Sequence, residues 1–136
     1  MQFATTRHPQ SRIGFSQALA QGLAADGGLF VPAEWPAFAL KDLAVPANTE
    51  GLALLAGAVL QPFASGDPLQ AALGDICSEA FNFPAPQFWL DDAERLGVLE
   101  LFHGPTAAFK DFGARLLAAA LARLRSEEHT SELQSP

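Results

Sequence analysis

Cysteine and histidine are scarce in this chain of 136 residues, and each scarcity argues against a class of site. Cys77 is the one cysteine, so no disulfide can form within the chain, and we expect a reducing compartment. The three histidines, His8, His103 and His129, lie far apart, with no cysteine or carboxylate at the spacing of metal ligands. The sequence therefore predicts neither a disulfide framework nor a metal site.

Basic residues are also few: the chain has 8 lysines and arginines but 15 aspartates and glutamates, which gives a net charge of −7. This balance argues against binding to nucleic acid or to an anionic membrane. No charged leader with an apolar core opens the chain, and no apolar run reaches the roughly 20 residues that span a bilayer. Hydrophobic residues make up 49% of the chain, enough for one domain with a core. We therefore expect a cytoplasmic globular protein.

Only two lysines occur, and Lys110 stands inside the most informative stretch of the chain, Leu101 to Leu117. Apolar residues recur at helical spacing, at positions 109, 112, 116, 117, 120, 121 and 124. Lys110 is therefore expected in the first turn of a helix, where the helix dipole disfavours a cation. Burial between Phe109 and Phe112 would disfavour the charge further, and a neutral amine is a nucleophile that forms an imine with a carbonyl. The alternative is an ordinary lysine whose ammonium reaches water or pairs with Asp111.

The segment HGPTAAFKDFGAR resembles the lysine segment of the threonine synthase family, a group of fold-type-II enzymes that use pyridoxal 5'-phosphate (PLP). The family pattern runs approximately HGPT-x-AFKDFG-x-R, and its fixed positions are met by His103, Gly104, Pro105, Thr106, Ala108, Phe109, Lys110, Asp111, Phe112, Gly113 and Arg115. Two further segments are similar to the same family: FSQALAQGLAADGGLFVP, from Phe15 to Pro32, and the stretch from Val59 to Phe83. The resemblance implies that Lys110 holds PLP as a Schiff base.

The resemblance also implies the chemistry of the complete enzyme. O-phospho-L-homoserine and water would be converted to L-threonine and phosphate, and the amine of Lys110 would move protons at Cα and Cβ. His103 would either contact the substrate or only hydrogen-bond its own loop. Two alternatives stay open: a phospholyase of the same fold that acts on the same substrate, and a catalytically inactive truncated lobe.

The remaining pattern predicts an α-rich α/β fold with short strands. Ser16 is expected to cap the first helix, and Asp67 is expected to cap a later one, with Pro68 in its first position. Cys77 is expected to be an inert core residue. The predicted elements are a strand at 2–6, a helix from Ser16 to Leu23, a turn at 26–28, a strand from Leu29 to Val31, helices from Gly51 to Phe63 and from Leu69 to Phe81, a charged linker or short helix from Leu90 to Leu96, a strand from Val98 to Phe102, and the lysine helix to Leu124.

Polar residues after Leu124 do not continue the helical pattern. Residues 125–135 can be encoded by a DNA string that resembles a sequencing adapter, so we expect a non-native tail at 125–136; a natural disordered tail is the alternative. The resemblance divides the rest into an N-terminal domain at 1–97 and, at 98–124, the opening strand and helix of the PLP-binding lobe. The chain would then be truncated, would lack the C-terminal part that carries the phosphate-binding loop, and would expose apolar surface.

Overall fold

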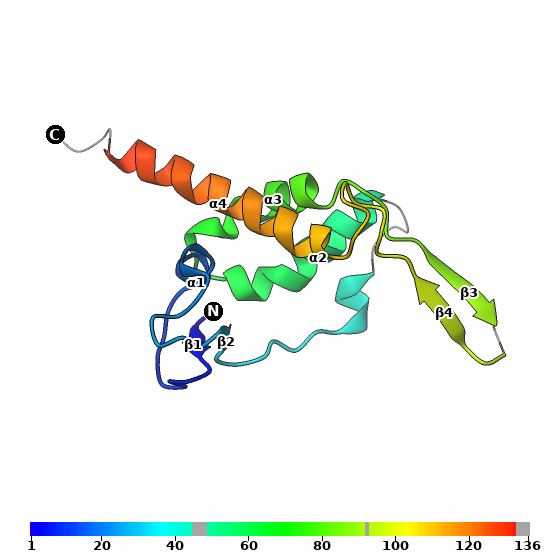
Figure 1. Ribbon diagram of the computed structural model, residues 1–136, viewed down its shortest axis with the longest axis horizontal. Coiled ribbons are helices and arrows are strands. Elements are labelled where there is room, and N and C mark those ends of the chain that lie inside the picture. The colour runs from blue at the N-terminus through cyan, green and yellow to red at the C-terminus, as the bar shows by residue number, and fades with distance from the viewer. Residues whose placement is uncertain (45–48, 92, 133–136) are drawn as a thin grey trace.

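The computed structural model describes residues 1–44, 49–91 and 93–132 and shows an α-rich α/β fold, as predicted. Figure 1 shows the helices in the centre, one small sheet beside them and a β-hairpin projecting from the opposite end. The elements in chain order are β1 (Phe3–Thr5), α1 (Phe15–Gln21), β2 (Phe30–Pro32), the 3₁₀ helix η1 (Leu40–Leu43), α2 (Thr49–Ala64), the 3₁₀ helix η2 (Pro68–Gln70), α3 (Leu73–Ala80), β3 (Gln87–Asp91), β4 (Leu96–Leu99) and α4 (Lys110–Glu132).

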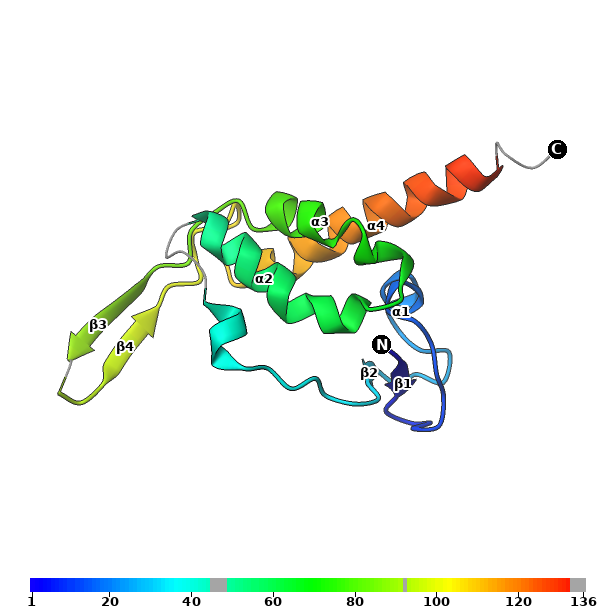
Figure 2. The same cartoon turned by 180° about the vertical axis from the view of Figure 1, so that it is seen from behind.

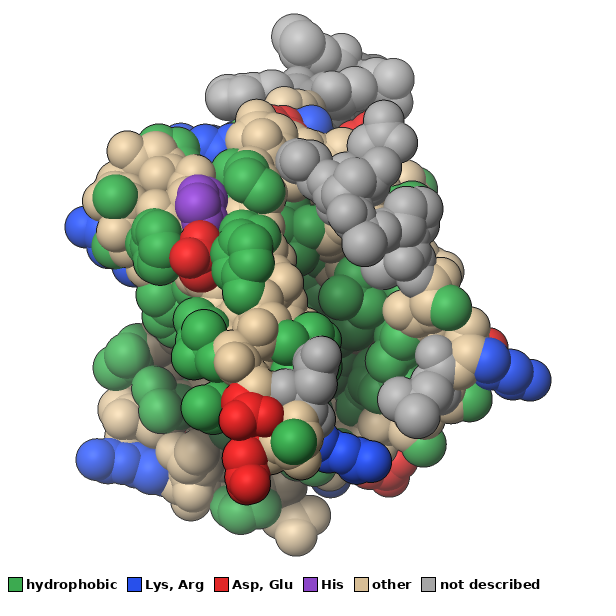
Figure 3. Space-filling view, turned by 90° about the vertical axis from the view of Figure 1, so that its right-hand side faces the viewer, with side chains coloured by type: hydrophobic (Ala, Val, Ile, Leu, Met, Phe, Trp, Pro, Cys, Tyr) green, Lys and Arg blue, Asp and Glu red, His purple; other side chains and the backbone are tan. Residues whose placement is uncertain are grey.

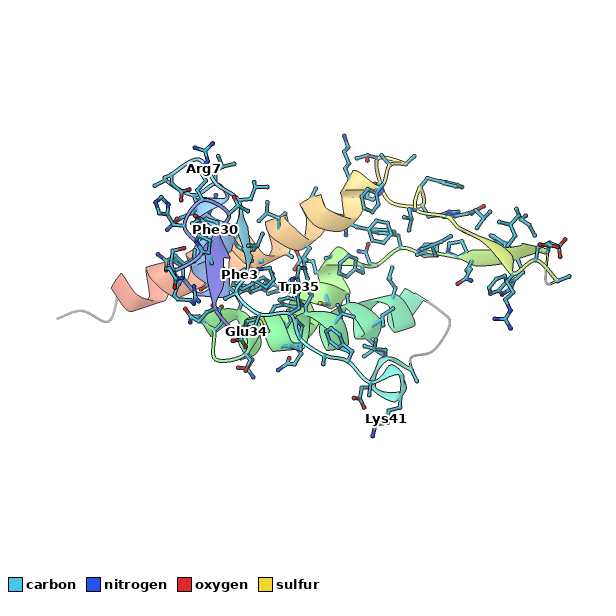
Figure 4. The ribbon with its side chains drawn as sticks, turned by 90° about the horizontal axis from the view of Figure 1, so that it is seen from below. Phe3, Arg7, Phe30, Glu34, Trp35 and Lys41 are labelled. Carbon is cyan, nitrogen blue, oxygen red and sulfur yellow. The ribbon has the colours of Figure 1, made fainter. Side chains whose placement is uncertain are left out.

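The N-terminal sheet pairs β1 with β2 in antiparallel register, with Phe3 opposite Pro32. Both strands were predicted, although β2 begins one residue later than expected. Trp35, labelled in Figure 4, follows β2, and its ring meets Phe63 of α2 edge-on with centroids 6.5 Å apart. The ring of Phe3 lies 5.7 Å from that of Phe15 in α1. Aromatic contacts therefore tie this sheet to the helices.

Asp26 fixes the turn that precedes β2. Its carboxylate accepts hydrogen bonds from the Thr5 hydroxyl (2.6 Å) and from the Gly28 amide (2.7 Å), and His8 Nδ1 lies 2.6 Å from the same group. Gly27, in the predicted turn at 26–28, has a positive φ of 76°. The hydrogen bond from Thr5, followed by those from His8 and Gly28, lowers the pKa of Asp26 to about 2.

A single carboxylate, that of Asp67, joins α1 to η2. It caps η2 by accepting a hydrogen bond from the Leu69 amide (3.1 Å), and Pro68 takes the first position of that turn, as predicted. The same carboxylate accepts hydrogen bonds from the amide (2.9 Å) and the hydroxyl (3.0 Å) of Ser16. The prediction that Ser16 caps α1 is therefore wrong: α1 begins at Phe15, and the Ser16 hydroxyl donates to Asp67 instead.

The main core lies between α2, α3 and α4, which Figure 2 shows next to one another in the middle of the molecule. Leu73, Ile76 and Cys77 of α3 are all buried. Cys77 is a free thiol in this core, as predicted, and burial raises its pKa to about 11. The predicted helix from Leu69 to Phe81 is divided, because η2 covers its start and α3 begins only at Leu73.

β3 and β4 pair as an antiparallel hairpin. The predicted linker or short helix from Leu90 to Leu96 is therefore wrong, and the strand predicted from Val98 to Phe102 begins and ends earlier. Asp92, which belonged to that linker, lies outside the described residues. Arg95 takes a positive φ of 53° just before β4, a conformation that the sequence does not signal because no glycine stands there.

Every residue of β3 and β4 is exposed, including large apolar side chains such as Phe88 (52%) and Trp89 (57%). Figure 3, which faces the hairpin end of the molecule, shows many apolar side chains at the surface. A lone two-stranded hairpin is marginally stable in water. The predicted exposure of apolar surface is confirmed.

α4 continues to Glu132, beyond the predicted end at Leu124. Residues 133–136 lie outside the described residues. That the segment 125–136 is non-native stays a prediction. The division of the chain at 97/98 also stays a prediction, and the structure places that boundary within β4.

Candidate active site

Lys110 is the first residue of α4, as predicted, and its side chain is exposed. The prediction that Phe109 and Phe112 bury it is wrong. Phe109 is itself 70% exposed, whereas Phe112 turns into the core, where its ring meets Phe83 edge-on with centroids 5.0 Å apart. The exposed side chain fits the alternative in which the ammonium of Lys110 reaches water. The ion pair with Asp111 is not formed, and Lys110 has no ion pair among the residues that the structure describes.

The geometry of α4 explains this exposure. Its buried side carries Asp111, Ala119 and Ala120, and it packs on α1 and α3. Lys110 belongs to another side of the helix, on which Gly113, Ala114 and Leu117 follow at helical spacing and are all exposed. The amine therefore projects from an exposed helix face and is open to approach from solvent.

The loop before Lys110 is held by the carboxylate of Asp111. Asp111 is only 4% exposed, and it accepts hydrogen bonds from the Thr106 amide and the Thr106 hydroxyl, both at 2.8 Å. Gly104 approaches this carboxylate so closely that a Cβ there would lie 2.5 Å from Asp111 Oδ2. Burial alone would raise the pKa of Asp111, but the hydrogen bonds from Thr106, the Ala108 backbone and the charge of Lys110 outweigh it and lower the pKa.

Ala107 lies inside this loop with a φ of 52°, in the left-handed region that non-glycine residues avoid. Its amide donates a 3.0 Å hydrogen bond to the Gly104 carbonyl, which closes a tight turn. A left-handed alanine costs about 1–2 kcal/mol. Strain of this kind persists only where surrounding contacts impose it, and it concentrates at functional sites.

His103 precedes the loop and is exposed. Its Nε2 lies 2.6 Å from the Glu100 carboxylate, and its ring stacks on Phe102 with centroids 4.7 Å apart. The structure thus gives His103 a local partner, which fits the second of its two predicted roles. Contact with a substrate stays a prediction.

Arg115 has a role that the sequence did not reveal. Its guanidinium donates hydrogen bonds to the carbonyls of Ala80 and Glu79, both at 2.8 Å, and to Asn82 Oδ1 at 2.9 Å, and it lies 5.8 Å from the centre of the Phe83 ring. The last carbonyls of a helix have no partner within that helix and carry partial negative charge. Arg115 therefore caps the C-terminal end of α3 from α4, and so fixes the helix that carries Lys110.

A groove of about 720 Å³ lies between α2 and α3, lined by residues such as Leu54, Gly57, Gln70 and Phe81. Lys110 and its loop do not line it. Within residues 1–44, 49–91 and 93–132 no cluster of histidine, cysteine and acidic residues could hold a metal ion. No helix in these described ranges is both long and apolar enough to cross a membrane.

Comparison with known proteins gives a consistent result. Residues 2–81 match the family described as the threonine synthase N terminus. The chain is 40% identical over 128 residues to threonine synthase from Haemophilus influenzae, and the alignment covers 93% of this chain and 29% of that protein. It is 34% identical over 128 residues to threonine synthase from Escherichia coli, and this alignment covers 94% of this chain and 29% of the relative.

Solved structures agree with these relatives. A PLP-bound threonine synthase from Brucella melitensis superimposes with a TM-score of 0.79 at 35% identity, over 95% of this chain and 28% of that one. Threonine synthase from yeast superimposes with a TM-score of 0.75 at 28% identity, over 99% of this chain and 28% of that one. The chain thus spans less than a third of the length of the relatives that it matches.

Proposed function

Because the chain belongs to the threonine synthase N-terminal family, we propose that it is the lysine-bearing N-terminal part of a PLP-dependent threonine synthase. The complete enzyme would act in the cytoplasm and convert O-phospho-L-homoserine and water to L-threonine and phosphate. The structural observation that supports the proposal is the position of Lys110, the first residue of α4, directly after a loop that Asp111 holds. The proposal also rests on the match of residues 2–81 to the family.

The residues present fit the proposed cofactor in one respect. Lys110 offers a primary amine that an aldehyde can reach, and the Brucella melitensis relative is a PLP-bound threonine synthase. When bound, PLP withdraws electrons from the Cα of an amino-acid substrate. Lys110 would hold the cofactor and move a proton at that Cα. The groups that bind the phosphate of PLP would belong to the part of the relatives beyond this chain.

For the chain on its own we propose no turnover. It spans 29% of the Haemophilus influenzae relative, and its hairpin and the Lys110 side of α4 are open to solvent. Catalysis needs a site that holds substrate in place and excludes water. An inactive lobe is therefore the proposal for the isolated polypeptide, and threonine synthase is the proposal for the protein of which it is a part.

A chimera tests the proposal. Residues 1–124 of this chain would replace the matching segment of the Haemophilus influenzae relative, and threonine and phosphate would be measured with O-phospho-L-homoserine as substrate. We expect both products from the chimera, their loss in Lys110→Ala, and no loss in the control Lys41→Ala, because Lys41 lies exposed on η1 (Figure 4). Threonine formation by Lys110→Ala would refute the role of Lys110. Phosphate without threonine would favour the phospholyase alternative.

A further inference from the structure

Asp111 follows Lys110 directly, and the chemistry proposed above gives it no part. Among the described residues, Thr5 and Asp111 are the buried polar side chains, and Asp111 is the more buried at 4% exposure. An ionised carboxylate is expensive to bury unless hydrogen bonds replace the water that it loses. The position next to the proposed cofactor lysine therefore calls for a physical explanation.

The contacts of Asp111 connect the two ends of one short loop. Its carboxylate lies in the first turn of α4, and both of its hydrogen bonds from Thr106 come from the far side of the loop. Gly104 is packed against the same carboxylate, where a Cβ would not fit. The Asp111 amide donates in turn to the Ala108 carbonyl at 3.1 Å. The path of the chain into Lys110 is therefore set by Asp111 on the inside of the turn.

We propose that Asp111 is a positioning residue for Lys110: by holding Thr106 and the close approach of Gly104, its carboxylate fixes the direction in which the chain enters α4 and so where the amine is presented. The inference rests on the proposed role of Lys110. It assigns Asp111 no contact with substrate or cofactor.

The left-handed conformation of Ala107 supports this assignment. Alanine disfavours the left-handed backbone region in which Ala107 lies, at a φ of 52°, so contacts with other residues must impose this turn. Charge-assisted hydrogen bonds are the stronger kind, and both bonds from Thr106 to Asp111 belong to it. Removing them frees the loop to relax, and the start of α4 can then move relative to the loop.

The test uses the whole chain and the probe PLP, with Lys41 as an internal reference. The protein is mixed with PLP, reduced with borohydride, and the labelled peptides are quantified by mass spectrometry as the ratio of Lys110 to Lys41. We expect the folded wild type to differ in this ratio from the same chain in denaturant. Asp111→Asn and Thr106→Val should shift the ratio to the denatured value, and Thr106→Ser, which keeps the hydroxyl, should restore it. Hydrogen exchange of the Thr106 amide should speed up about tenfold in Asp111→Asn.

Asp26→Asn is the matched control for loss of stability. Asp26 also accepts one hydroxyl and one amide hydrogen bond, from Thr5 and Gly28, but it lies in the N-terminal sheet. Its substitution should leave the labelling ratio unchanged. If Asp111→Asn fails to fold, Thr106→Val removes one donor only and carries the test. A wild-type ratio equal to the denatured ratio, or a ratio that no loop variant changes, would overturn the proposal.

The outcome is separable from that of the proposed function. If the ratio depends on Asp111 and the chimera makes no threonine, positioning of the amine stands and the proposed enzyme activity fails. If the chimera makes threonine and the labelling ratio is the same in the Asp111 and Thr106 variants as in the wild type, the activity stands and the positioning role fails.

Discussion

Arg115 offers a sharp test of how α4 is fixed to the rest of the molecule. The perturbation is Arg115→Met, which keeps the aliphatic stem and removes the guanidinium. Three hydrogen bonds of 2.8–2.9 Å and the contact with the Phe83 ring are lost together. The bond to the Ala80 carbonyl is partly buried, so its loss also leaves a helix carbonyl without a partner.

The magnitude follows from these contacts. A hydrogen bond to a charged group contributes about 1.5–3 kcal/mol when sheltered, exposed bonds contribute a fraction of that, and an exposed cation–π contact adds about 0.5–1 kcal/mol. We therefore expect Arg115→Met to lower the free energy of unfolding by about 3 kcal/mol. Arg115→Lys keeps the charge but not the planar fork, and should lose about half as much.

Urea denaturation followed by circular dichroism measures this change. Arg123→Met is the matched control, because Arg123 lies on the same helix and its guanidinium pairs with the Glu79 carboxylate at 2.8 Å. That pair is partly exposed, at 33% for Arg123 and 53% for Glu79, so its loss should cost only about 0.5 kcal/mol. Equal losses in the two variants would refute the reasoning, since they would mean that capping α3 contributes no more than a surface ion pair.

Three further predictions concern other parts of the chain. The free energy of unfolding should stay level above about pH 4 and decrease as the pH falls toward 2, because the folded pKa of Asp26, about 2, lies below its usual value of 3.8. Asp26→Asn should make the free energy of unfolding less dependent on pH in this range. The same pH dependence in the variant and the wild type would contradict the prediction. Ala107→Gly should raise the free energy of unfolding by about 0.5 kcal/mol, whereas Ala114→Gly, on the exposed side of α4, should lower it by about 1 kcal/mol. A decrease for Ala107→Gly as large as that for Ala114→Gly would exclude strain at Ala107. Cys77 should react with Ellman's reagent at pH 8 far more slowly than in denaturant, because its thiol is buried and its pKa is raised to about 11; equal rates would show that α3 is not packed.

Elements with local signals were predictable from the sequence. The α2 helix has an apolar face at helical period, and the Asp67–Pro68 pair predicted a helix start at Pro68, which is where η2 begins. The hairpin was not predictable, because charged residues near its turn obscure the strand period and Arg95, rather than glycine, takes the left-handed position. A turn in which an unusual residue takes the left-handed position cannot be recognised from the sequence.

The candidate site was predictable in identity and not in geometry. The position of Lys110 in the first turn of its helix followed from the apolar period, and the structure confirms it. The sequence left burial and exposure of the Lys110 amine as two alternatives, because which side of α4 faces the core depends on contacts with α1 and α3. The roles of Asp111 and Arg115 likewise depend on partners that only the folded chain brings within hydrogen-bond distance.

The shared carboxylate of Asp67 has a consequence for the order of events during synthesis. α1 is seven residues long, well below the length of about 12–15 residues at which isolated helices become marginally stable in water. The group that anchors its first turn lies 51 positions further along the chain. We therefore expect α1 to form stably only after the turn that contains Asp67 has left the ribosome.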